Sequence, residues 1–172
     1  MRRVLQAALL MSSSMAALAA GRPQIPTELT PPAGAKLVLK AHATGSQIYT
    51  CKAGNDGAFQ WVLKGPDADL HDQKGAVIGH HSVGPTWKHK DGSEVTGKAS
   101  AHVDSPDSDS IPWLLLSATG HTGEGLLAKV TAVQRINTKG GKPAAASPCD
   151  ASKDGTETKS PYSADYLFYA EK

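Results

Sequence analysis

The sequence predicts an all-β protein, a single-domain antiparallel β-sandwich or barrel with long surface loops. Short apolar runs are separated by turns rich in Gly, Pro, Asn and Asp. Several of these runs alternate apolar and polar residues, as strands with one buried face do. The chain beyond its N-terminal segment has no long helical period of apolar residues. Together these patterns are typical of sandwiches and barrels.

The N-terminal segment has the pattern of a secretory signal peptide. Arg2 and Arg3 precede an apolar stretch at 4–17, and Ala17-Leu18-Ala19 supplies a small-x-small cleavage pattern. We therefore expect an exported protein that is periplasmic or extracellular. The predicted organisation is a signal peptide at 1–20, an extended Pro-rich leader at 21–34 and a single β-domain at 35–172.

Charge and hydropathy narrow the range of partners. The chain has 18 Lys and Arg against 16 Asp and Glu, and loss of the two signal-peptide arginines leaves 16 against 16. A net charge of zero does not favour nucleic acid as a partner. No stretch after the signal is long and apolar enough to act as a transmembrane anchor. The expected partner is an unknown small molecule, a glycan or an envelope component.

Cys51 and Cys149 are the two cysteines of the chain. Export would place them where disulfides persist, so we expect them to be paired. Closing a loop of roughly 100 residues stabilises a fold by about 4–5 kcal/mol in the chain-entropy model. The wide spacing excludes a catalytic CxxC pair.

The first half of the domain predicts a series of short strands. Residues 35–43 and 46–51 alternate and are expected to form a hairpin that turns at Thr44-Gly45. Residues 58–64 are the next strand, and Gly65-Pro66 is expected to end it. One helical turn is predicted at 67–72, followed by a strand at 76–83. Adjacent residues of a strand point to opposite faces, so His80 and His81 should not meet one metal.

The clearest turn signal is Asp91-Gly92, which favours a two-residue hairpin loop of type I′. Counting outward, His89 would face Glu94, and Trp87 would face Thr96. These four side chains would then share one face of the hairpin. Trp87 is the best candidate for partial exposure among the tryptophans, although packing in the core is favoured over stacking on a ligand.

Later strands are predicted at 99–103, which continues the hairpin, and at 113–118, a continuous apolar run expected to be buried on both faces. Residues 126–136 predict the longest strand. The aromatic run at 162–169 should pair with it or lie beside it. The segments at 104–110, 120–125 and 137–141 are predicted loops or turns.

Several motifs of the chain are similar to those of a known family. They are Gly45-x-Gln47-Ile48-Tyr49-x-Cys51, Gly84-Pro85-Thr86-Trp87 with Asp91-Gly92-Ser93, Ile111-Pro112-Trp113-Leu114-Leu115, Val130-Thr131 with Gln134-Arg135-x-Asn137-Thr138-x-Gly140-Gly141, and Tyr162-x-Ala164-Asp165-Tyr166-x-Phe168-Tyr169. In these motifs the chain resembles a family of secreted bacterial and fungal proteins catalogued as domain of unknown function 3455. The resemblance implies export and a single domain. It implies no reaction, so no catalytic residue is assigned.

The leading functional hypothesis is a non-enzymatic exported β-domain that binds a ligand or has a structural role in the envelope or outside the cell. Its candidate ligand-binding residues are Trp87, His89, Glu94, Gln134 and Arg135, with Thr96 on the same face of the hairpin.

The alternative hypothesis is a metal-dependent or His/Glu acid–base enzyme. His80, His89 and His102 fall on neighbouring predicted strands, and imidazole suits copper or zinc. No HExxH or GxSxG motif is present, and no cofactor is predicted beyond that metal alternative. A concave pocket with two histidines and a carboxylate would favour the enzyme.

Overall fold

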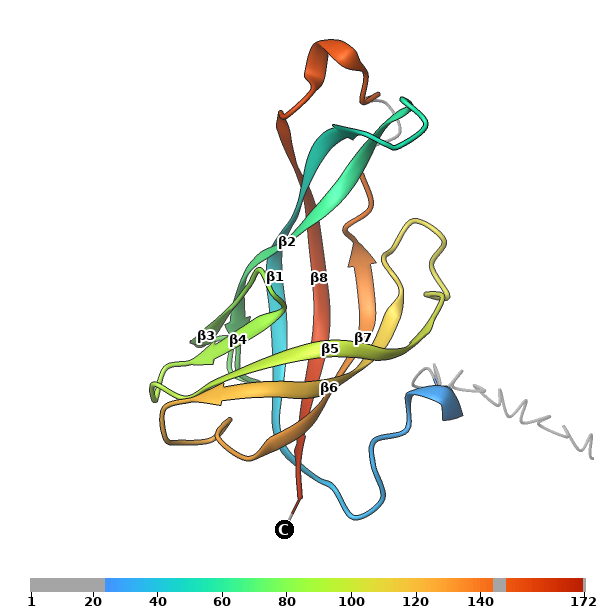
Figure 1. Cartoon of the computed structure of the whole chain (residues 1–172). Helices are drawn as coiled ribbons and strands as arrows, with labels where there is room; N and C mark the ends of the chain where they lie inside the picture. The colour runs from blue at the N-terminus through green and yellow to red at the C-terminus, as the bar shows by residue number, and fades with distance from the viewer. Residues whose placement is uncertain (1–23, 144–147, 172) are drawn as a thin grey trace, which may run out of the picture.

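The computed structural model describes residues 24–143 and 148–171, and it shows eight antiparallel strands that follow one another around a closed barrel (Figure 1). The prediction of an all-β sandwich or barrel is therefore confirmed, and the barrel is the form adopted. The predicted signal peptide, 1–20, lies outside the described residues. The strands are β1 (Lys36–Ala53), β2 (Phe59–His71), β3 (Val77–Ser82), β4 (Thr86–His89), β5 (Glu94–Val103), β6 (Trp113–Thr122), β7 (Val130–Gly140) and β8 (Glu157–Ala170).

Helical structure in these ranges is limited to two short 3-10 turns, η1 (Thr27–Leu29) and η2 (Ala151–Lys153). Neither has the length or apolar character that a bilayer-spanning helix needs. η1 belongs to the segment predicted as a leader, and its Leu29 is fully buried against the barrel. This part of the leader is therefore packed on the domain.

The predicted hairpin at 35–51 is wrong, because β1 runs without a break through Thr44-Gly45. Gly45 pairs with Ala68 of β2. A Cβ atom at this glycine would lie 2.2 Å from the carbonyl oxygen of Asp67. Gly45 is thus needed for a close approach of two strands rather than for a turn.

The predicted end of a strand at Gly65-Pro66 and the helical turn at 67–72 are also wrong. β2 continues to His71, and Gly65 takes a φ of +150° where the pairing with β1 shifts register. The glycine therefore marks a bulge, which lets the strand bend without ending. Beyond it, Ala68 and Leu70 are buried while Asp67 and Asp69, which alternate with them, are exposed, which is the period of a strand.

The hairpin of β4 and β5 has a different register from the prediction. Trp87 pairs with Val95 and Lys88 with Glu94, one residue away from the expected pairing. Gly92 has a φ of +93°, but Asp91 does not have a positive φ. A type I′ turn needs both, so the loop holds three residues and closes with glycine in the left-handed region.

The second half of the barrel agrees better with prediction. β5 continues through 99–103, and β8 pairs with β7 as expected. β6 is less buried than predicted, since Trp113 and Leu116 are buried but Ser117 is exposed. β7 starts at Val130 rather than at 126 and extends as far as Gly140 into the turn predicted at 137–141. β8 also pairs with β1, and this closes the barrel.

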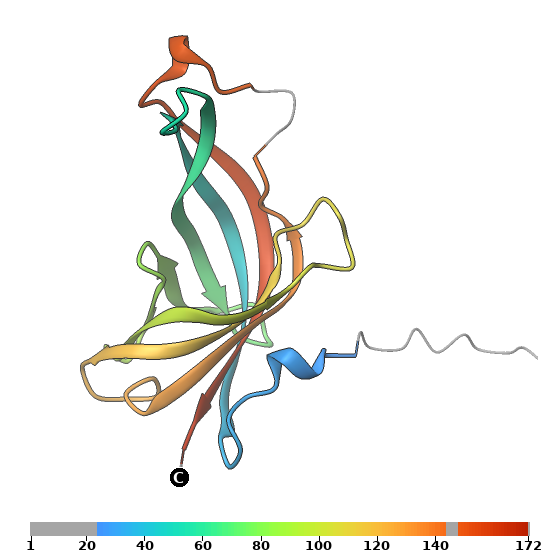
Figure 2. The same cartoon turned by 45° about the vertical axis from the view of Figure 1, so that its right-hand side comes forward.

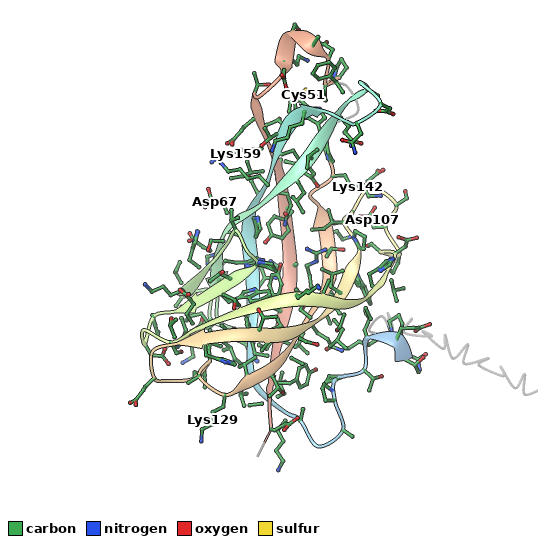
Figure 3. All side chains as sticks on the ribbon, viewed as in Figure 1. Cys51, Asp67, Asp107, Lys129, Lys142 and Lys159 are labelled. Carbon is green, nitrogen blue, oxygen red and sulfur yellow. A yellow bond between two sulfur atoms is a disulfide. The ribbon has the colours of Figure 1, made fainter. Side chains whose placement is uncertain are left out.

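An arm formed by residues 49–62 and 148–160 projects beyond the rest of the barrel (Figure 2). The predicted disulfide lies within it and joins Cys51 to Cys149, with 5.5 Å between the Cα atoms. Figure 3 shows Cys51 near the tip of the arm. The bond ties the end of β1 to the segment that leads into β8, and this pairing confirms the prediction.

Two groups of apolar residues are buried, one on each face of the strands. The main core lies inside the barrel and includes Trp87, Tyr166 and Phe168. The second, which we call the outer seam, lies where η1 covers the outer face. Its buried apolar residues are Leu29, Trp113 and Ile136, and the hydrogen-bonded side chains of Gln134 and Tyr169 adjoin them.

Candidate functional site

The barrel contains a cavity of about 320 Å³, which we call the cup. Several of its lining residues, including Leu63 and Lys98, are exposed, so the cup opens to solvent. All eight strands contribute to it. Its lining is Gln47 of β1, Leu63, Lys64, Gly65 and Pro66 of β2, His81 of β3, Gly84 and Pro85 before β4, Trp87 of β4, Gly97, Lys98 and Ala99 of β5, Leu114 and Leu116 of β6, Arg135 of β7 and Tyr166 of β8.

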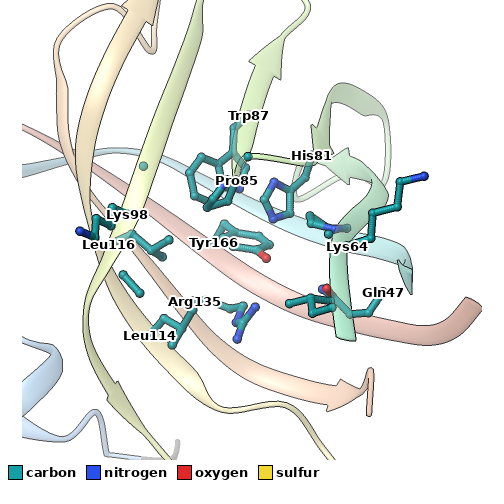
Figure 4. Close-up of a pocket in the computed structure, with 16 residues that line it drawn as sticks. Gln47, Lys64, His81, Pro85, Trp87, Lys98, Leu114, Leu116, Arg135 and Tyr166 are labelled. Atoms are coloured by element: carbon teal, nitrogen blue, oxygen red, sulfur yellow. The ribbon is translucent and has the colours of Figure 1, made fainter. Parts of the chain in front are cut away.

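Three buried rings form the floor of the cup (Figure 4). His81 and Trp87 are cross-strand partners, and their rings stack with 4.5 Å between centroids. Tyr166 meets both rings edge-on, at 4.9 Å from His81 and 5.6 Å from Trp87. Gly97 leaves room for this arrangement, since a Cβ there would lie 3.2 Å from the Trp87 ring. Such aromatic contacts hold the floor in one geometry.

His81 is a neutral imidazole with a defined tautomer. Its Nδ1 lies 2.8 Å from the carbonyl oxygen of Thr86, which can only accept, so Nδ1 carries the proton. Burial lowers the pKa of His81 to about 3; the hydrogen bond to Thr86 opposes this shift, and Arg135 and His80 add to it. Nε2 is consequently an unprotonated acceptor near neutral pH.

Three of the lining residues carry buried polar atoms without a hydrogen-bond partner: Gln47 Nε2, Trp87 Nε1 and the Tyr166 hydroxyl. The Tyr166 hydroxyl is close enough to Tyr162 and Arg135 to interact electrostatically, but neither meets hydrogen-bond geometry. Burial raises the pKa of Tyr166, and Arg135 opposes that rise. An unpartnered buried donor costs about 1–3 kcal/mol, and folded proteins leave few of them.

The cup is positively charged. Arg135 is the cross-strand partner of Tyr166, and its Nε and Nη2 both donate to the carbonyl oxygen of Pro112, at 3.1 and 2.9 Å. These two bonds fix the guanidinium in place. Lys64 and Lys98 also line the cup, whereas no Asp or Glu does so among the described residues.

The structure brings two of the five predicted ligand-binding residues to the cup, Trp87 and Arg135. Trp87 is 0% exposed, so the expectation of partial exposure is wrong. The register of the hairpin explains this, because Trp87 faces inward with Val95.

His89, Glu94 and Gln134 do not line the cup. His89 contacts Asp91, 3.0 Å from Nδ1 to Oδ2, rather than facing Glu94 as predicted. The one-residue difference in register places Glu94, and Thr96 with it, on the outer face. Gln134 is buried in the outer seam.

Asp91 has a structural role that the turn prediction missed. It accepts hydrogen bonds from the backbone of Leu126 and from the backbone and hydroxyl of Ser93. These bonds, that of Leu126 first, hold the pKa of Asp91 well below its ordinary value. They fasten the β4–β5 loop to the β6–β7 connection.

The structure does not bring all three histidines of the metal hypothesis together: His80 and His89 line one surface hollow with Asp69, but His102 does not line it. His80 pairs with Asp67 and Asp69, at 3.2 Å each, while His102 is exposed on β5 opposite Leu114. Residues 24–143 and 148–171 contain no group of three or more His, Cys, Asp and Glu that could hold a metal ion. The cup itself has one histidine and, within the same ranges, no carboxylate.

Sequence reasoning missed Gln47, His81 and Tyr166. Gln47 and Tyr166 belong to the quoted family motifs, which gave no role to individual residues. His81 was expected to point away from His80, and the structure agrees, since His81 is 2% exposed and His80 is exposed. If the pairing of β3 with β4 had been predicted with its observed register, His81 would have been placed beside Trp87.

The family model described as "Protein of unknown function (DUF3455)" matches residues 32–170. The chain belongs to this family. The match covers the whole barrel and every residue of the cup. Searches of curated proteins and of solved structures found no match. The DUF3455 family brings no activity with it, so the function has to be argued from the cup.

Proposed function

We propose that this DUF3455 protein is an exported small-molecule binding protein whose ligand occupies the cup. The observation that carries the proposal is the set of unpartnered buried donors, Gln47 Nε2, Trp87 Nε1 and the Tyr166 hydroxyl, on three residues that line one cavity of about 320 Å³. Small-molecule sites of roughly 300–1,000 Å³ combine an apolar lining with a few polar groups in the same way. A ligand that accepts hydrogen bonds would offset the cost of these donors.

The shape of the site favours a small molecule over the glycan or envelope component also expected from the sequence. The aliphatic part of the lining comes from Leu63, Leu114 and Leu116 with two prolines. Such a cavity excludes a long polar chain and accepts a compact apolar body.

Export is supported by two observations. Residues 1–20 carry the charge, apolar run and cleavage pattern of a signal peptide. The disulfide between Cys51 and Cys149 suits an oxidising compartment.

Binding of the neutral fluorophore N-phenyl-1-naphthylamine to the mature protein tests the proposal. We expect one probe per chain, with enhanced emission. Ala99 lines the cup and is exposed, so Ala99→Trp should fill it and weaken binding by about tenfold or more, or about 1.4 kcal/mol.

Ser100→Trp is the matched control, because Ser100 is the exposed neighbour that does not line the cup. This variant should bind the probe as the wild type does. Absence of binding, or equal binding by Ala99→Trp and wild type, would overturn the proposal. Near-UV circular dichroism establishes that both variants keep the native fold.

A further inference from the structure

We infer that the ligand of the cup is an organic anion, an acid group such as a carboxylate on a compact apolar body. The inference rests on the proposed function and specifies the class of molecule. It follows from the charge of the cup, the kind of polar atoms at its floor and the apolar nature of the remaining lining.

The charge argument centres on Arg135. Its guanidinium is half-buried inside a barrel and is fixed by two bonds to the Pro112 carbonyl, which is neutral. Among the described residues, no carboxylate forms an ion pair with it. A desolvated cation without a counter-ion is costly, so an anion in the cup would be stabilised.

The polar atoms at the floor agree with this charge. The unpartnered atoms of Gln47 and Trp87 are N–H donors, and the Tyr166 hydroxyl can donate as well. Figure 4 shows the ends of Gln47, Arg135 and Tyr166 converging below the stacked rings. A carboxylate only accepts and has four lone-pair positions on its two oxygens, so it matches a site made of donors.

The other basic residues act at the rim. In Figure 4 the amino groups of Lys64 and Lys98 extend away from the rings. Lys64 also pairs with Glu157, 2.6 Å from Nζ to Oε1. Such exposed charges raise the rate at which anions arrive more than they add to affinity.

The apolar body would lie against Leu114, Leu116, Pro66 and Pro85, which line the cup. Leu63 stands at the opening with 52% of its surface exposed, which a bound ligand would cover. An anion without an apolar body, such as phosphate, would leave this lining in contact with water.

Two fluorophores that differ by one acid group test the inference. 8-Anilinonaphthalene-1-sulfonate is N-phenyl-1-naphthylamine with a sulfonate added. We expect the sulfonate to bind the wild type about tenfold or more tightly, since charge-assisted bonds to Arg135 are strong. Its affinity, but not that of the neutral probe, should fall as salt is raised.

Arg135→Gln should remove the preference for the sulfonate while leaving the neutral probe bound. Lys139→Gln is the matched control, because it removes one positive charge from an exposed residue that pairs with Asp107 outside the cup. Ala99→Trp should block both probes. This result would show that the sulfonate binds in the cup.

The outcomes separate the two proposals. If both probes bind the wild type equally and salt affects neither, the anion inference is overturned and the proposed function stands. If neither probe binds, or neither is blocked by Ala99→Trp, the proposed function itself falls. The comparison of the two probes on the wild type needs no variant, so a poorly folding Arg135→Gln protein leaves the test intact.

Discussion

Residues 24–143 and 148–171 contain two buried glutamines, each 1% exposed, whose side-chain amides differ in their hydrogen bonding. Gln134, in the outer seam, donates from Nε2 to the Leu29 carbonyl at 2.5 Å and accepts from the Tyr169 hydroxyl at 2.9 Å. Gln47, in the cup, has no partner for its Nε2. Both ends of the Gln134 amide are therefore hydrogen-bonded, whereas the Nε2 of Gln47 is left without a partner.

This difference agrees with a structural role for Gln134 and with the binding role proposed for the cup. The amide of Gln134 attaches the η1 segment to β7, and both of its ends are used. At the floor of the cup, Gln47 and Tyr166 keep donors that the protein does not satisfy. Two further buried donors, Trp113 Nε1 in the outer seam and the Tyr162 hydroxyl, also lack a partner, but they do not line the cup. Under the proposed function, a ligand in the cup would offset the cost of the donors of Gln47 and Tyr166.

The largest expected effect comes from exchanging each glutamine for leucine. Gln134→Leu should lower the free energy of unfolding by about 2–4 kcal/mol, because it leaves the Leu29 carbonyl and the Tyr169 hydroxyl unpaired. Gln47→Leu should change it by less than about 1 kcal/mol, since it removes an unsatisfied donor. Urea unfolding measures both values, and equal losses would contradict the contrast.

The next effect concerns pH and His81, the titratable ring at the floor of the cup. Its folded pKa, about 3, lies below the unfolded value of about 6.5, so the unfolded chain binds the proton first. This contribution to stability is complete above pH 6.5 and is lost as pH falls towards 3. The loss should be about 1.4 kcal/mol per pH unit, or about 2–3 kcal/mol between pH 6.5 and 4.5.

Unfolding of wild type and His81→Gln in urea at several pH values checks this prediction. The variant should lack that part of the slope. The range stays above pH 4.5 because carboxylates such as Asp91, whose pKa is lowered in the folded protein, affect stability at lower pH. Parallel slopes for the two proteins would rule out a buried neutral imidazole.

The smallest effect separates two tyrosines. The hydroxyl of Tyr49 donates to the carbonyl oxygen of Gly141 at 2.6 Å, so Tyr49→Phe should cost about 1–2 kcal/mol. Tyr166→Phe removes an unpartnered hydroxyl and should leave stability unchanged or raise it by up to about 1 kcal/mol. Thermal unfolding distinguishes the two, and a destabilised Tyr166→Phe protein would show that its hydroxyl is satisfied after all.

The fold class and the disulfide could be predicted from the sequence, because alternation, turn residues and a pair of cysteines are local or countable signals. The sequence did not predict that β1 continues through Gly45 and that β2 continues through Gly65. A glycine favours the prediction of a turn when only its neighbours in sequence are known. In the barrel, Gly45 accommodates the backbone of β2 and Gly65 forms a bulge, and both roles depend on the partner strand.

The candidate site was found only in part for the same reason. Asp91-Gly92 fits a two-residue or a three-residue loop, and the choice moves every following side chain to the other face. The bonds from Leu126 and Ser93 to Asp91 accompany the three-residue loop, and Leu126 lies far along the chain. Trp87 and Arg135 could be picked out as residue types, but their meeting with Gln47 and Tyr166 required the closed barrel.

The first and last strands pair to close the barrel, and this constrains the order in which the chain can fold. β1 pairs with β8 from Lys36 to Thr50, so β1 and β7 keep free hydrogen-bonding edges until β8 is delivered. A chain that is synthesised N-terminus first therefore holds an unfinished sheet until its final segment emerges, and such pairing between distant segments is slow. A protein truncated before Glu157 would keep two unpaired strand edges. These edges would lead to aggregation rather than to a smaller barrel.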